Sequence, residues 1–348
     1  MKKFIKVMIL FALITILVSC SAKQNKNNDK KNSESKNERI TVGFSIDTLA
    51  IERWQRDLDV FINKLKELGA DAIVQNAGNS VEEQNRQLLY LLERNVDVFV
   101  ILPKDADSLS DSIAKIKSKG IPVISYDRLI FNADVDLYLT IDSQKVGEFM
   151  AGGLLSRSTG TRWFEILGSE DDYNMTLIEN GIANTLKNTP ITIAHKFYTS
   201  GWNYDLSYQE MARLISEKNI PDAVICGNDA IASSVIQAIS RYYNDSHILV
   251  CGQDADIAAC QAIVQDKQVF TIFKPINALA ELTAEFAVYL ARGEDISNKG
   301  YTIKPINNGA GNIPAIWLEP VLVDKSNIDE VIIGSGFHSY PSIYGFQQ

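Results

Sequence analysis

Short apolar runs alternate with amphipathic stretches along most of the chain, and this alternation restricts the fold more than any other feature. The first run is Ile40 to Ile46. The stretch from Ile51 to Leu68 follows it, with apolar residues at helical spacing. About eleven strand-like runs recur in this way, which indicates parallel sheets with helices on both faces. This number of strands is too large for one compact sheet of this kind. The sequence therefore predicts an α/β fold of two doubly wound lobes.

The run from Ile121 to Tyr126 reads as a buried strand, and two opposite charges, Asp127 and Arg128, follow it at once. In open α/β sheets, ligands bind beyond the carboxyl ends of the strands. An ion pair that closes a turn would explain this dipeptide alone. However, polar or aromatic clusters also follow other strand-like runs, so we expect a polar binding site at these ends. The clusters are Arg53–Trp54, Asp172 with Asn174, Asn228–Asp229, Gln253–Asp254 and Lys274.

The N-terminus carries a processing signal. A lysine-rich start precedes the apolar segment 7–18, which is too short for an easy bilayer span. Leu17-Val18-Ser19-Cys20 then resembles a bacterial lipobox. By that resemblance, residues 1–19 are a lipoprotein signal peptide and Cys20 is the lipidated first residue of the mature protein. An ordinary secretory signal or a plain anchor is the alternative.

Residues 20–38 are rich in lysine, asparagine and serine and contain almost no apolar side chains. Such a segment cannot bury a core, so we expect a disordered tether. The tether and its lipid predict an extracytoplasmic protein on the periplasmic or outer cell-surface side. Its only contact with the membrane would be the lipid anchor.

Charge and composition exclude several classes of protein. The net charge is −9, and the basic residues gather in the N-terminal tail, which argues against binding nucleic acid. The three histidines share no metal-ligand spacing, so we expect no metal.

Three cysteines, Cys226, Cys251 and Cys260, remain beyond the lipobox. An odd number is a poor disulfide framework, and buried thiols are the better interpretation. We expect no cofactor.

Six short motifs occur in a fixed order: Ile51–Gln55, Tyr126–Arg128, Gly201–Trp202, Gly227–Ala230, Gly252–Asp256 and Lys274–Pro275. In this order they resemble the bacterial D-xylose-binding proteins, which are periplasmic-binding-protein-like sugar receptors of ABC transporters. The resemblance covers roughly Ile40 to His338. Gly-Asn-Asp-Ala alone is a weak signal because it also occurs in other sugar-binding proteins and in repressors. Arg-Trp-Gln together with Asp-Arg and Gly-Gln-Asp-Ala-Asp is much more specific.

The resemblance implies roles for ten side chains. Trp54 and Trp202 look like opposing platforms for the C–H faces of a pyranose, and Arg53 looks like a hydroxyl-binding residue. Asp127 and Arg128 look like ligands on the hinge side. The remaining polar contacts would come from Asp172, Asn174, Asn228, Asp254 and Lys274.

Two residues depart from the family pattern. At Tyr173 and Met175, the family pattern has a smaller amide and a small residue, so the shape of this pocket wall and the sugar preference are affected.

In this family the chain also crosses between the two lobes three times, through a three-segment hinge. The crossings are expected near Ser143–Gly147, Pro275–Ala278 and Asn308–Ala315. The expected parts are an N-terminal lobe of 39–145 plus 278–310, a C-terminal lobe of 146–277 plus 311–340, and a tail of 341–348.

An enzyme is the first competing class. Asp127, Asp172 and Asp254 could be imagined as glycosidase carboxylates, but such a pair needs one acid that stays protonated. The cationic side chains Arg53, Arg128 and Lys274 accompany them and favour ionised carboxylates. No phosphate loop, Gly-x-Ser-x-Gly motif or Cys/His nucleophile is evident. We therefore expect a binding protein rather than an enzyme.

A repressor of the same fold class would need a helix-turn-helix before Arg39, where a signal and a tether stand instead. The expected function is capture of D-xylose or a related monosaccharide, by closure of the cleft, for an ABC permease. A receptor that reports sugar binding to a membrane histidine kinase or chemoreceptor remains the alternative, because it would use the same cleft.

Overall fold

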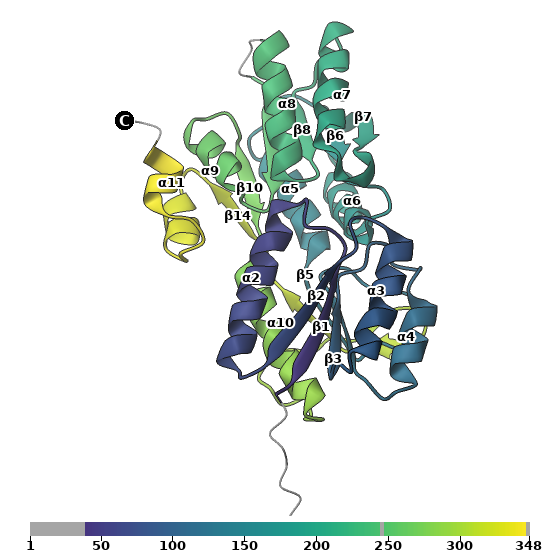
Figure 1. Ribbon diagram of the computed structural model, residues 1–348. Helices are drawn as coiled ribbons and strands as arrows, with labels where there is room; N and C mark the ends of the chain where they lie inside the picture. The colour runs from purple at the N-terminus through teal and green to yellow at the C-terminus, as the bar shows by residue number, and fades with distance from the viewer. Residues whose placement is uncertain (1–38, 244–246, 346–348) are drawn as a thin grey trace, which may run out of the picture. The chain divides into compact units, whose positions relative to one another are not determined.

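The computed structural model describes residues 39–243 and 247–345 (Figure 1). The expected signal peptide, Cys20 and the tether lie outside the described residues, as do the last three residues of the expected tail. Within the described ranges, none of the helices combines the length and apolar character needed to cross a bilayer.

The first sheet has six parallel strands in the order β13-β5-β4-β3-β1-β2. Helices α2 and α10 lie against each other, and α3 lies against α4. Side chains alternate between two cores. In β3, Val98 and Val100 join one hydrophobic cluster, and Phe99 and Ile101 join the other. The strands are β1 (Thr41–Ile46), β2 (Asp71–Asn76), β3 (Val98–Ile101), β4 (Val123–Tyr126), β5 (Leu137–Ile141) and β13 (Ala315–Leu318), and the helices are α2 (Glu52–Glu67), α3 (Val81–Glu93), α4 (Ser110–Lys117) and α10 (Ile276–Ala291).

The second sheet repeats this plan in the order β14-β10-β9-β8-β6-β7, with one antiparallel strand, β14, at its edge. Trp163 and Phe164, neighbours on β6, enter different hydrophobic clusters, so this sheet also has a core on each face. The strands are β6 (Arg162–Leu167), β7 (Thr192–Tyr198), β8 (Ala223–Cys226), β9 (Leu249–Gln253), β10 (Phe270–Phe273) and β14 (Val321–Asp324), and the helices are α5 (Ser143–Leu155), α6 (Tyr173–Leu186), α7 (Tyr204–Ser216), α8 (Asp229–Tyr242) and α9 (Ile257–Val264).

We call the first sheet with its helices the N-terminal lobe and the second the C-terminal lobe. The chain passes between the sheets after β5, after β10 and after β13. The third passage, at Glu319–Pro320, lies later than expected. β13 pairs in parallel with β5, so assigning residues 315–318 to the C-terminal lobe was wrong. Ala315 to Val323 reads as one extended run, but Pro320 has no N–H for a sheet ladder and divides the run between two sheets.

The C-terminal segment contains a π-helix, η2 (Asp329–Ile333), and a short helix, α11 (Tyr340–Tyr344), that packs against α9. Ile343 is fully buried there. The expected tail from residue 341 therefore begins inside an ordered helix. A small hairpin of β11 (Ile306–Asn307) and β12 (Asn312–Ile313) was also not predicted.

The three cysteines of the C-terminal lobe are buried free thiols, which confirms the interpretation from the sequence. Burial raises the pKa of the Cys226 thiol well above its usual value. Among the described residues, no group of three or more His, Cys, Asp or Glu side chains is placed to hold a metal ion.

Candidate binding site

One pocket is lined by all ten residues that the sequence singled out. It contains about 380 Å³ of empty space, including its opening to solvent. The N-terminal lobe supplies Arg53, Trp54, Asp127 and Arg128. Lys274 lies at the second passage between the sheets, and the C-terminal lobe supplies Asp172, Asn174, Trp202, Asn228 and Asp254.

Arg53 and Trp54 lie in the first turn of α2. The Arg53 guanidinium lies over the Trp54 ring, 4.3 Å from its centroid, and that of Arg128 lies 5.6 Å from it. Trp54 is only 3% exposed and belongs to a hydrophobic cluster that includes side chains of both lobes. It is therefore a core residue and a pocket residue at once, and two cations lie against its ring.

Asp127 adopts a left-handed backbone conformation, with φ of +61°, directly after β4. Few residues other than glycine do so, and such conformations gather at functional sites. Neighbouring groups hold this turn in place. The Asp127 N–H donates to the carbonyl of Leu139 at 2.8 Å, and its own carbonyl accepts from Tyr138 Oη at 3.0 Å and Thr140 Oγ1 at 2.7 Å. The turn places Asp127 and Arg128 in the pocket wall.

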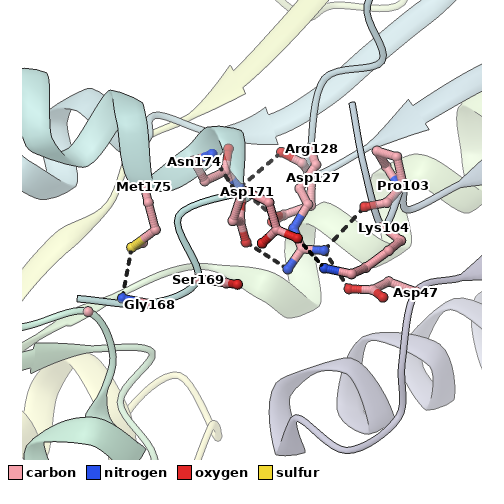
Figure 2. A network of polar contacts seen from close by, with 12 residues as sticks. Asp47, Pro103, Lys104, Asp127, Arg128, Gly168, Ser169, Asp171, Asn174 and Met175 are labelled. Carbon is pink, nitrogen blue, oxygen red and sulfur yellow. Dashed lines mark hydrogen bonds and ion pairs between the residues drawn. The ribbon is translucent and has the colours of Figure 1, made fainter. Parts of the chain in front are cut away.

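Arg128 joins the two lobes (Figure 2). Its Nη1 lies 2.6 Å from Asp47 and 3.2 Å from the carbonyl of Pro103, and its Nη2 lies 2.7 Å from Asp172 in the C-terminal lobe. Burial lowers the pKa of the guanidinium, but the charges of Asp172 and Asp47 outweigh it and hold the pKa above its usual value. Arg128 is thus a fixed cation between two carboxylates.

Asp127 is the second junction between the lobes. It forms an ion pair with Arg53, and Asn174 Nδ2 of the C-terminal lobe donates to its Oδ1 at 2.9 Å. Burial raises the pKa of this carboxyl. Arg53, Lys274 and Arg128 more than offset that effect, so the pKa lies below its usual value and the group is ionised at neutral pH.

Two further contacts join the lobes near the pocket. Lys104 of the N-terminal lobe lies 2.7 Å from Asp171 (Figure 2). The rings of Phe131 and Tyr173 meet edge to face with centroids 4.9 Å apart. Tyr173, one of the two departures from the family pattern, therefore packs against the opposite lobe and does not itself line the pocket.

Two polar residues of the C-terminal lobe are helix caps. The Asp172 side chain accepts from the N–H of Asn174 at 3.0 Å, and that of Asn228 accepts from the N–H of Ile231 at 2.9 Å. These caps place the start of α6 at Tyr173 and that of α8 at Asp229. Burial raises the pKa of Asp172 despite the opposing charge of Arg128, a shift opposite in direction to that of Asp127.

Asp254 lies between two cations. Lys274 Nζ is 2.6 Å from its Oδ1, and Arg53 Nη1 is 4.0 Å away. Like Asp127, Asp254 follows a strand and has a positive φ, here +98°. Both carboxylates thus stand on strained turns at strand ends, where the sequence pattern predicted the site.

Trp202 lies in a single turn of 3₁₀ helix, Ser200–Trp202, and is half-buried. A side chain at Gly168 would begin only 2.2 Å from the indole ring, so the ring lies directly on the glycine backbone. The ring also packs against three hydrophobic clusters. Trp202 therefore packs against the core more closely than its position in a loop after Gly201 suggests.

Residues 42–295 match the profile of the periplasmic binding protein domain. The chain belongs to this family. The D-xylose-binding periplasmic protein of Haemophilus influenzae is 39% identical over 310 residues, which cover 88% of this chain and 92% of that protein. The D-xylose-binding periplasmic protein of Escherichia coli is 36% identical over 304 residues, covering 86% and 91%.

A solved structure supports the same conclusion. The ABC transporter solute binding protein from Clostridium phytofermentans, with bound β-D-glucose, is 29% identical and has a TM-score of 0.79. The match covers 87% of this chain and 99% of that one. These likenesses confirm the two-lobed α/β fold, and they confirm a binding protein rather than an enzyme.

Five further residues line the pocket of this periplasmic binding protein. The sequence provides some indication that Gln253 and Ser143 lie near the site. Gln253 precedes Asp254 in a strand-end cluster, and Ser143 lies at an expected crossing between the lobes. Met175 stands out only as a departure from the family pattern in this wall, and Ile178 gives no signal beyond its place in an apolar stretch. The full additional set is Ile51, Ser143, Met175, Ile178 and Gln253.

Several buried polar atoms of the pocket residues have no hydrogen-bond partner among the described residues. They include Arg128 Nε, Asn174 Oδ1 and Gln253 Oε1, and the indole nitrogens of Trp54 and Trp202. Such groups are uncommon in proteins, since each costs free energy when it stays unpaired. Here they offer both donors and acceptors to a polar ligand.

Proposed function

We propose that the protein captures D-xylose in this pocket, closes around it and delivers it to an ABC permease. The observation that carries the proposal is the convergence of charged and amide side chains from both lobes on one small pocket with two indole rings. The D-xylose-binding relatives support xylose as the ligand, and the glucose-bound relative supports a monosaccharide more generally.

The chemistry of the pocket suits a pyranose. Carboxylates accept hydrogen bonds from hydroxyl groups, whereas guanidinium, ammonium and amide groups donate to them. Hydrogen bonds to charged groups contribute roughly 1.5–3 kcal/mol each, against about 1 kcal/mol for neutral ones. Arg53 is already held by Asp127, and Arg128 by Asp47 and Asp172, so little side-chain ordering is needed when a sugar binds.

Calorimetric titration of the purified full-length protein with a panel of pentoses and hexoses tests the ligand. We expect saturable 1:1 binding of D-xylose, tighter than that of the other sugars. Absence of binding to every monosaccharide in the panel would contradict the proposal.

Closure is supported by the contacts that join the lobes around the pocket: Arg128 with Asp172, Asn174 with Asp127, and Lys104 with Asp171. A ligand that touches both lobes favours the arrangement in which they meet, and only such differential affinity shifts an equilibrium. Small-angle scattering should show a radius of gyration that falls on saturation with D-xylose. An unchanged radius would remove closure from the proposal.

Delivery to a permease is supported by the likeness to an ABC transporter solute binding protein. A strain that lacks the gene should lose uptake of radiolabelled D-xylose and recover it when the gene is returned. Unchanged uptake would instead favour a receptor that signals through a membrane protein.

Lipid anchoring rests on the lipobox-like Leu17–Cys20. Replacing Cys20 with serine should move the protein from the detergent phase to the aqueous phase in partitioning experiments. Retention of the Cys20→Ser variant in the detergent phase would argue for a different anchor.

A further inference from the structure

Helix α6 presents two kinds of surface to the pocket. Asp172 and Asn174, at its start, are polar. Met175 and Ile178 come next and are 2% and 1% exposed. Because they are three positions apart, these two side chains lie on one face of the helix. We call Met175 and Ile178 the apolar wall. It can form van der Waals contacts, but it offers a hydroxyl group no strong hydrogen-bond partner.

Met175 is held in position. The N–H of Gly168 donates to its Sδ at 3.4 Å (Figure 2), and Gly168 in turn carries the Trp202 ring. An unbranched methionine usually adapts to a ligand by changing rotamer. The contact with Gly168 and the surrounding hydrophobic cluster restrict that freedom, so the apolar wall is a fixed boundary of the pocket.

Most other lining residues are polar, so a bound pyranose must turn its one edge without a hydroxyl group toward the apolar wall. In a pentopyranose that edge is the C5 methylene. In a hexopyranose C5 carries a hydroxymethyl group. Building on the proposed function, we infer that the apolar wall receives the C5 methylene of a pentopyranose and excludes the hydroxymethyl group of a hexopyranose, which makes Met175 a specificity-determining residue.

Two costs oppose a hexose in this pose. Its extra carbon and oxygen must fit against closely packed side chains, and its hydroxyl group would be buried without a partner. Discrimination of this kind reaches about ten- to a hundredfold in other apolar pockets. The glucose-bound relative indicates that the fold itself accommodates a hexose, so selectivity must come from individual lining residues.

Replacing Met175 with alanine tests the inference. D-glucose differs from D-xylose only by the hydroxymethyl group, so the ratio of the two dissociation constants, measured by calorimetry, is the readout. We expect the wild-type protein to bind xylose at least tenfold more tightly than glucose. Met175→Ala should reduce that ratio about tenfold, mainly by binding glucose more tightly. Met175→Leu, which keeps the volume, should preserve the ratio.

Met150→Ala is the matched control. Met150 is fully buried in the same hydrophobic cluster but does not line the pocket, so its loss should weaken packing and leave the ratio unchanged. If Met175→Ala does not fold in a thermal melt, Met175→Val provides a smaller truncation with the same expected direction.

Three results separate the outcomes. Equal affinity of the wild-type protein for xylose and glucose, or an unchanged ratio in the folded Met175 variants, would overturn the inference while leaving sugar binding intact. A ratio that falls equally in Met150→Ala would overturn it too. Failure of the wild-type protein to bind any monosaccharide would instead overturn the proposed function on which it rests.

Discussion

The two lobes build their halves of the pocket from different kinds of interaction. The N-terminal lobe uses buried ion pairs, with Arg53 and Arg128 held by Asp127 and Asp47. The C-terminal lobe adds helix caps to its ion pairs. Asp172 and Asn228 each accept a backbone N–H at the start of a helix, while Asp172 also pairs with Arg128 and Asp254 with Lys274. The comparison teaches that substitutions in the two halves should destabilise the protein by different amounts. Loss of a buried counterion costs several kilocalories per mole, whereas loss of a cap costs about one.

The largest effect is expected at Arg128. Arg128→Met leaves the buried Asp47 and Asp172 carboxylates without their counterion and should reduce the free energy of unfolding by about 3–5 kcal/mol. Urea unfolding measures it. Arg213→Met is the control, because Arg213 pairs with Glu210 and Glu217 on a largely exposed side chain and its loss should matter little. Equal losses in both variants would show that burial of the ion pair does not determine how much it stabilises the fold.

Trp202→Ala should come next, and it affects binding more than folding. We expect xylose affinity to fall well over tenfold, a cost of about 2 kcal/mol or more for a desolvated aromatic anchor. Some stability should also be lost, because the ring packs on Gly168 and against three clusters. Calorimetry and urea unfolding separate the two effects. Normal xylose binding by the folded variant would show that Trp202 is not a platform.

Asn228→Ala tests the cap in the C-terminal lobe. The variant should lose about 1 kcal/mol of stability and also bind xylose more weakly, whereas Asn228→Asp should keep the cap. Asn203 provides a comparison, since it also caps a helix, α7, by accepting from the N–H of Asp205, but it is exposed and does not line the pocket. Asn203→Ala should show the stability loss with unchanged affinity. If both variants lose affinity equally, capping and binding cannot be separated at these positions.

The smallest expected effect concerns pH. Burial raises the pKa of Asp57 to about 7 despite Arg53 and the hydrogen bond from Tyr126. Between about pH 4 and 7 the folded protein keeps a proton that the unfolded chain has lost, so this group makes stability fall as pH rises through that range. Asp57→Asn should flatten this fall when the free energy of unfolding is measured at about pH 5 and 8. Identical slopes in wild type and variant would exclude Asp57 as the cause.

The sequence was most informative where a local pattern carries the structure. Alternating strands and helices predicted both lobes, and polar or aromatic residues after strand-like runs pointed to the pocket edge, whereas Trp202 and the full set of ten residues came from the family resemblance. The third passage between the sheets was misplaced, because an extended run such as Ala315–Leu318 does not indicate which sheet it joins. Ile178 was missed for a related reason. Helical spacing shows which face is apolar but not whether that face lies against protein or a pocket.

Lys274 belongs to both the hinge and the pocket. Its ammonium group binds Asp254 beside the pocket, while its backbone joins β10 to α10, where the chain passes from one sheet to the other. The proline ring of Pro275 restricts φ at the next residue, here −74°, so few torsions nearby can absorb a rotation of the lobes. Rotation about this segment therefore displaces the ammonium group from the pocket. In the proposed closure, opening the lobes would also withdraw Lys274 from the sugar, so the rate of this motion would set the lifetime of the complex.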